Sequence, residues 1–124
     1  MECVITKKKK IIIVENEIII ALDLKFRLEK LGYNVIDIVK GEDAIKRIGE
    51  INTDIVLMDI QLKGESDGIQ IAKGIHKLYN IPFIYLSGVH DNTTLKMAKQ
   101  TEPSGFITIP FLDREVKKIL VTQD

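Results

Sequence analysis

The 124-residue sequence has a single cysteine, Cys3, and no tryptophan. An intrachain disulfide therefore cannot form, and one lone cysteine fits a protein of a reducing compartment. With only two histidines beside that cysteine, the chain cannot build a zinc site of ordinary ligand spacing. It also lacks a GxGxxG or Walker sequence and a GxSxG elbow, so nucleotide binding and serine-hydrolase chemistry have no support.

The chain has no excess of charge of either sign, because 18 Lys and Arg balance 18 Asp and Glu. This balance argues against bulk electrostatic binding to nucleic acid or to a membrane surface. No apolar run approaches the roughly 18–20 residues that a membrane span needs. The lysines at positions 7–10 precede an apolar run that is too short for a signal peptide. We therefore expect a cytoplasmic protein that binds neither nucleic acid nor membranes.

What the sequence does contain is an alternation of short apolar runs with amphipathic stretches. The apolar runs predict strands at residues 11–14, 34–39, 55–58, 83–86 and 106–109. Apolar residues at helical spacing predict helices at residues 17–31, 42–50, 67–79, 93–101 and 112–121. We interpret residues 1–9 as an N-terminal tail and residues 10–124 as one domain.

Strands that alternate with helices predict an α/β domain with a parallel sheet covered on both faces. Right-handed crossovers restrict the topology to a doubly wound sheet. Five strands fit the flavodoxin-like (βα)5 arrangement with strand order 2-1-3-4-5.

Polar residues follow three of the apolar runs directly. Glu15 and Asn16 follow the first, Asp59 follows the third and Ser87 follows the fourth. In this architecture ligands bind beyond the carboxyl ends of the strands, so these residues would converge at one edge of the sheet. Oxygen ligands suit Mg²⁺, and a carboxylate there can act as a nucleophile toward a phosphoryl group. Each residue alone could equally be a helix cap or a turn residue; the combination favours a site.

With these motifs, the sequence resembles receiver domains of two-component response regulators from about Lys10 to Leu120. The segments that carry the resemblance are IIIVENE (11–17), DIVLMD (54–59), DGI (67–69), IPFIYLSG (81–88) and GFITIPF (105–111). The third-strand segment with the following Asp-Gly, and the fourth-strand IP…S, are specific in combination.

The resemblance implies the chemistry of the site. Asp59 is implied as the phosphoryl acceptor, and Glu15 as an acid that holds Mg²⁺, usually through water. The backbone carbonyl of Gln61 would be a further Mg²⁺ ligand. Ser87 matches the hydroxyl that moves to bond the phosphoryl group.

The resemblance also implies how the signal enters and leaves. Phe106 stands at the position of an aromatic switch residue, and Pro110 matches a proline that follows a cis peptide. The implied donor is a histidine kinase or a phosphotransfer protein. A protein partner would bind the face formed by the fourth helix, fifth strand and fifth helix, and a homodimer is also compatible.

Two positions depart from the family pattern. Asn16 stands where the second acid, a direct metal ligand, is usual, and Ile109 stands where a lysine is usual. The two changes offset each other in formal charge, since one carboxylate and one cation are lost together. We expect weaker Mg²⁺ binding, slower phosphorylation and weaker coupling to the switch, because lysine would give the phosphoryl group a charge-assisted hydrogen bond.

Three readings of function follow. Glu15, Asp59 and Ser87 favour a phosphorylatable switch or relay that is not an enzyme beyond its own phosphoryl transfer. Asn16 and Ile109 favour a pseudo-receiver, a phosphorylation-independent protein-interaction or dimerisation module. The third reading is a small α/β enzyme or a flavodoxin-like ligand binder.

Overall fold

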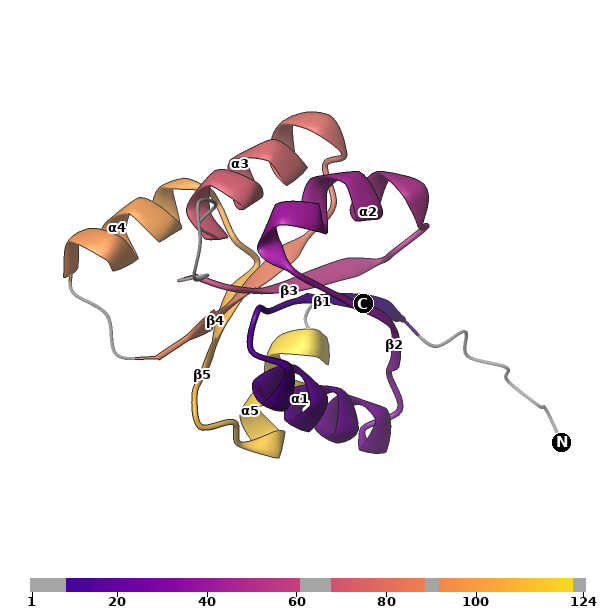
Figure 1. The fold of residues 1–124 in the computed structure, drawn as a ribbon. Helices are drawn as coiled ribbons and strands as arrows, with labels where there is room; N and C mark the ends of the chain where they lie inside the picture. Colours follow the sequence, from indigo (N-terminus) through magenta and orange to yellow (C-terminus); the bar gives the residue numbers. More distant parts are fainter. Residues whose placement is uncertain (1–8, 61–67, 89–91, 122–124) are drawn as a thin grey trace, which may run out of the picture.

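The computed structural model describes residues 9–60, 68–88 and 92–121, in which strands and helices alternate along the chain (Figure 1). The strands are β1 Lys10–Val14, β2 Asn34–Val39, β3 Ile55–Asp59, β4 Phe83–Ser87 and β5 Gly105–Thr108. The α-helices are α1 Ile18–Lys30, α2 Ala44–Glu50, α3 Gly68–Leu78, α4 Asn92–Gln100 and α5 Asp113–Val121, and a 3-10 turn, η1 Gly41–Asp43, precedes α2.

The five strands form one parallel sheet in the order β2-β1-β3-β4-β5, which confirms the predicted flavodoxin-like topology. Helices α1 and α5 cover one face of the sheet, and α2, α3 and α4 cover the other (Figure 1). Because β1 and β3 lie in the interior of the sheet, their side chains are buried on both faces, as the continuous apolar runs predict.

The central strands supply two apolar cores with alternate residues. In β1, Ile12 and Val14 join the cluster under α2, α3 and α4, whereas Ile11 and Ile13 join the cluster under α1 and α5. This alternation is the two-residue period of a β-strand. The cores fix the strands in a register that brings their carboxyl ends to one edge.

The observed boundaries differ from the predicted ones by one or two residues, the larger difference at α2, which begins at Ala44 after the 3-10 turn η1. Strand β5 begins one residue earlier than predicted and ends at Thr108, so Ile109 follows the strand, although its N–H still donates to the Ser87 carbonyl at 2.9 Å. Pro110 has no N–H and cannot extend the ladder. The Ile109–Pro110 peptide is cis, as the resemblance implies. None of the described helices could cross a membrane.

Candidate functional site

Three neighbouring strands end at the same edge of the sheet and carry the predicted site residues there. In the sheet register Val14 lies beside Met58, and Asp59 lies beside Leu86. Glu15 therefore lies beside Asp59, and Ser87 ends the adjacent strand β4. The structure brings together the acid, the candidate acceptor and the hydroxyl at the edge where ligands of doubly wound sheets bind.

The carboxyl of Glu15 is buried, with 4% of the residue exposed. Its Oε1 atom accepts a hydrogen bond from the Glu17 N–H at 2.9 Å. Its Oε2 atom is buried and receives no hydrogen bond from the described residues. A buried carboxylate oxygen without a donor is costly, so this atom calls for a proton or a cation.

Asp59 accounts for much of the unusual chemistry of Glu15. Burial, followed by a hydrogen bond and charge repulsion with Asp59, raises the pKa of Glu15 from 4.5 to about 8, against the lowering effect of the Glu17 N–H. Two ionised carboxylates cannot donate to each other, whereas a protonated Glu15 can donate to Asp59. A cation that binds Glu15 would have to displace this proton.

The donor set fits a hydrated Mg²⁺ better than an all-protein metal cage. Among the described residues no cluster of three or more His, Cys, Asp or Glu side chains could hold a metal. Mg²⁺ commonly binds through one or two carboxylates and keeps several waters. Glu15 and Asp59 meet that requirement, and Glu15 Oε2 is an oxygen that a cation would satisfy.

Asn16 has a structural role that the sequence did not reveal. Its side-chain carbonyl accepts a hydrogen bond from the Gly41 N–H at 2.9 Å, which ties the end of β1 to the turn η1 after β2. One lone pair of this oxygen is thereby engaged. Its metal ligation, like that of the other site residues, stays a prediction. Gln61 lies outside the described residues.

Ser87 and Phe106 lie on adjacent strands at the other side of the site. Ser87 is buried, and its hydroxyl donates to the Gly88 carbonyl at 3.2 Å. Phe106 is half-buried, with its ring centroid 5.6 Å from that of Tyr85. The Tyr85 hydroxyl in turn lies 2.6 Å from Thr101 Oγ1, just after α4. Nothing in the sequence indicated this contact, because Tyr85 lies within an apolar strand and resembles any other core residue there.

The side chain of Ile109 packs at this edge and has no hydrogen-bond donor. Its side chain is partly buried against the core under α1 and α5. Its side chain carries no charge and so cannot offset the repulsion between Glu15 and Asp59.

Gly68 packs against the backbone at the end of β3. Its N–H donates to the Ile60 carbonyl at 3.0 Å, and α3 begins there, directly against the end of β3. A Cβ at this position would collide with the Asp59 carbonyl oxygen and would meet the Ile60 carbonyl oxygen at 2.8 Å. The only sequence signal for this contact was the Asp-Gly dipeptide in the resemblance.

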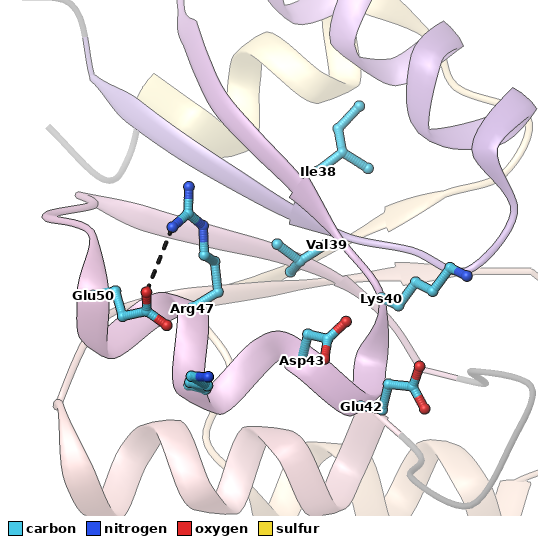
Figure 2. Close-up of a pocket in the computed structure, with 8 residues that line it drawn as sticks. Ile38, Val39, Lys40, Glu42, Asp43, Arg47 and Glu50 are labelled. Carbon is cyan, nitrogen blue, oxygen red and sulfur yellow. Dashed lines mark ion pairs between the residues drawn. The ribbon is translucent and has the colours of Figure 1, made fainter.

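A hollow of about 470 Å³ lies away from these residues, between the end of β2 and α2 (Figure 2). Its charged lining carries both signs: Lys40, Lys46 and Arg47 with Glu42, Asp43 and Glu50. Arg47 pairs with Asp37 at 2.6 Å and with Glu50 at 3.7 Å. Because the charges offset one another, this hollow does not select a ligand of one sign, and the strand ends remain the candidate site.

Comparison with known proteins agrees with this geometry. The sequence matches the response regulator receiver domain over residues 11–121. The structure superimposes with a TM-score of 0.88 on the signal receiver domain of a modulated diguanylate cyclase from Desulfovibrio desulfuricans G20, at 29% identity and 94% coverage of both chains.

Two further solved structures are similar along most of their length. One is the N-terminal domain of a response regulator/sensory box/GGDEF protein from Carboxydothermus hydrogenoformans (27% identity, TM-score 0.83, 93% of both chains). The other is the receiver domain of a signal transduction histidine kinase from Syntrophus aciditrophicus (26% identity, TM-score 0.77, 92% of this chain and 91% of that one). The sheet order, the acidic strand ends and the match over residues 11–121 together show that this chain belongs to the response regulator receiver domain family of two-component signalling.

Proposed function

We propose that this receiver domain accepts a phosphoryl group on Asp59 from a histidine kinase or a phosphotransfer protein. The observation that carries the proposal is the buried carboxyl of Glu15 beside Asp59. The Oε2 atom of Glu15 accepts no hydrogen bond from the described residues. When Glu15 gives up its proton, the two carboxylates suit a cation, and that cation would in turn offset the charge of a transferred phosphoryl group. The likeness to a receiver domain of a histidine kinase supports this class of donor.

In this proposal the carboxylate of Asp59 attacks the phosphorus atom while the bond between phosphorus and the donor breaks. The product is an acyl phosphate on Asp59, and the donor leaves with the electron pair of the broken bond. The acyl phosphate adds negative charge beside Glu15, so the site needs compensation for that charge as the transfer proceeds.

Mg²⁺ would supply that compensation by neutralising charge on the phosphoryl oxygens. Glu15 and Asp59 would hold it, with the Asn16 carbonyl and the backbone carbonyl of Gln61 as further ligands. The neutral Asn16 and the absence of a lysine at position 109 make the expected binding weak. Glu15 must lose its proton before it can act as a ligand.

The phosphorylated state would be reported through Ser87 and Phe106. The hydroxyl of Ser87 now donates to a neighbouring carbonyl, so it can exchange that partner for a phosphoryl oxygen. Phe106 lies on β5 beside Tyr85 of β4, whereas Ser87 lies beside Thr108, and the Phe106 ring contacts that of Tyr85. The output partner would bind the α4–β5–α5 face.

The proposal is tested by incubating the chain with Mg²⁺ and acetyl phosphate and measuring its intact mass. We expect a species heavier by one phosphoryl group in the wild type and none in Asp59→Asn. Asp43→Asn, which removes an exposed acid from η1, is the matched control and should still be modified. Absence of the heavier species at millimolar Mg²⁺ would contradict the proposal.

A further inference from the structure

Lys40 is the one base among the described residues that directly follow the five strands. These residues are Glu15 after β1, Lys40 after β2, Ile60 after β3, Gly88 after β4 and Ile109 after β5. They lie at the edge of the sheet that carries the candidate site. Because Ile109 has no charge, Lys40 is the only member of this set that could offset the negative charge of Glu15 and Asp59.

The backbone on both sides of Lys40 is hydrogen-bonded to the end of β1. The Val39 carbonyl, just before it, accepts a hydrogen bond from the Glu15 N–H at 3.0 Å. The Gly41 N–H, just after it, donates to the side-chain carbonyl of Asn16 at 2.9 Å. Lys40 is therefore held beside the acid and the amide that β1 brings to the site.

The side chain of Lys40 is exposed and extends toward this edge of the sheet. In Figure 2 it points away from Asp43, Arg47 and Glu50, which line the hollow beside α2, and toward the turn between β1 and α1. Neighbouring strands are about 4.8 Å apart, so β3 with Asp59 lies about two strand spacings from β2. The flexible four-carbon stem of a lysine lets its ammonium group reach across β1 toward Asp59.

A lysine is an unfavourable choice for the local structure at this position. Lys40 is the N-cap residue of η1, and its side chain makes no capping hydrogen bond. N-cap positions favour Ser, Thr, Asp and Asn, and the start of a helix favours negative charge. Among the described residues, no acid forms an ion pair with Lys40. Residues that break such local rules are expected at functional sites.

We propose that Lys40 supplies the positive charge for the phosphoryl group on Asp59, in place of the lysine that is absent at position 109. This inference rests on the proposed function, because it gives Lys40 a part in the same phosphoryl transfer. The ammonium group donates a charge-assisted hydrogen bond to a phosphoryl oxygen when the group arrives at Asp59.

The charge of Lys40 has opposite effects on the two ligands of the site. It attracts the phosphoryl group, which is negative, and it repels Mg²⁺. Loss of this charge should therefore slow phosphorylation without weakening Mg²⁺ binding. A purely structural role of Lys40 would not separate the two effects, because a distorted site would bind both ligands less well.

The rate of phosphorylation by acetyl phosphate at saturating Mg²⁺, followed by intact mass, tests the proposal. We expect Lys40→Met to react about two- to fivefold more slowly than the wild type, as for the loss of an exposed charge interaction. Lys40→Arg should restore the rate, and the difference should shrink at high salt because ions screen the charge. The matched control is Lys46→Met, which removes an exposed lysine of α2 and should react like the wild type.

Isothermal titration calorimetry measures the two binding steps separately. We expect Lys40→Met to bind Mg²⁺ at least as tightly as the wild type. With Mg²⁺ present, the variant should bind beryllofluoride, an analogue of the phosphoryl group, about two- to fivefold more weakly.

The outcomes distinguish this role of Lys40 from the proposed function. Equal rates and equal beryllofluoride affinities in the wild type and Lys40→Met would overturn the role of Lys40 and leave the proposed function intact. Weaker Mg²⁺ binding in Lys40→Met would also overturn it, since the residue would then support the site as a whole. A wild type that neither reacts nor binds beryllofluoride would contradict the proposed function and the role of Lys40 together.

Discussion

Glu15 illustrates how burial and a neighbouring acid change the chemistry of one side chain. Its carboxyl lies at the end of β1 with almost no access to solvent, and Asp59 faces it from β3. Together they raise its pKa to about 8, so at neutral pH the metal-free protein keeps most of Glu15 protonated. A cation that binds there must first displace this proton.

The stability of the metal-free protein should therefore fall with rising pH. The folded protein binds the Glu15 proton more tightly than the unfolded chain, whose carboxyl keeps the ordinary pKa of 4.5. The stabilising contribution is complete below pH 4.5 and is lost as the pH rises through about 8, with a total on the order of a few kcal/mol. Urea unfolding at several pH values measures this slope.

Glu15→Gln is the control for this pH dependence, since a neutral amide does not titrate. We expect a flatter profile in that variant. Mg²⁺ should stabilise the wild type more at pH 8.5 than at pH 6, because the competing proton has then left. A wild-type profile that rises steadily between pH 5 and 8 would show that another group dominates.

Ile109→Lys should accelerate phosphorylation of Asp59 by a small phosphodonor. A lysine can give a charge-assisted hydrogen bond to the phosphoryl group, which is worth about 1.5–3 kcal/mol or at least about tenfold in rate. Combining it with Asn16→Asp should also strengthen Mg²⁺ binding. The rate is measured as the growth of the phosphorylated species in intact-mass spectra.

Leu112→Lys adds the same charge to an exposed position three residues further on and should leave the rate unchanged. If Ile109→Lys behaves like Leu112→Lys, the missing lysine does not explain the slow reaction that we expect. Asn16→Asp should retain the Gly41 hydrogen bond, because a carboxylate oxygen can accept it as well.

At the scale of elements, hydrogen bonds and close backbone contacts join the strands to neighbouring helices and turns. The turn η1 is held to β1 through Asn16, and α3 begins in contact with the end of β3 through Gly68. The Tyr85 and Thr101 hydroxyls join β4 to the end of α4. Short polar or backbone contacts thus join β1, β3 and β4 to η1, α3 and the end of α4. In the proposed function, a change at Asp59 would reach the surface through these contacts.

Gly68→Ala should destabilise the fold and impair phosphorylation together. The added methyl group would collide with the Asp59 carbonyl, so either α3 or the acceptor must move. Overpacking of this kind costs about 1–3 kcal/mol. Thermal unfolding and the phosphorylation assay measure the two effects.

Gly88→Ala is the matched control, because no described atom lies within 4 Å of the position that a Cβ at Gly88 would occupy. We expect it to remain close to the wild type in stability. If Gly68→Ala is as stable and as readily phosphorylated as Gly88→Ala, the close approach to Asp59 has no energetic consequence.

At the scale of the whole molecule, one sheet joins two apolar cores. Leu28 of α1 and Ile75 of α3 are fully buried on opposite faces, and the central strands contribute alternate residues to both clusters. Strands shared in this way couple the two layers, so the domain should unfold as one unit.

Leu28→Ala and Ile75→Ala should each lower the unfolding free energy by about 2–5 kcal/mol. In both variants we expect urea transitions followed by far-ultraviolet circular dichroism and by the near-ultraviolet signal of tyrosine to coincide. Tyr85 is a suitable probe because it is buried between the sheet and the helices. Separate transitions in either variant would show that the two layers unfold independently.

The sequence by itself determined the order of the elements, the parallel sheet and the strand ends that carry Glu15, Asp59 and Ser87. These follow from local periodicity, since continuous β-branched runs must be covered on both faces and the polar residue after each run must lie at the edge. It also identified the departures at Asn16 and Ile109, because residue identity needs no coordinates.

Only the tertiary structure decided how those residues interact. The interaction of Glu15 with Asp59 and the bond from Asn16 to Gly41 join positions that are 44 and 25 residues apart, and the contact of Gly68 with Asp59 joins positions nine apart. Residue patterns carry no information on such distances. The same holds for the exposed apolar side chains of α1, which are those of Ile18, Ile19, Leu22 and Phe26. The sequence shows that they are apolar, but only the packing of α1 on the sheet decides which of its sides is buried.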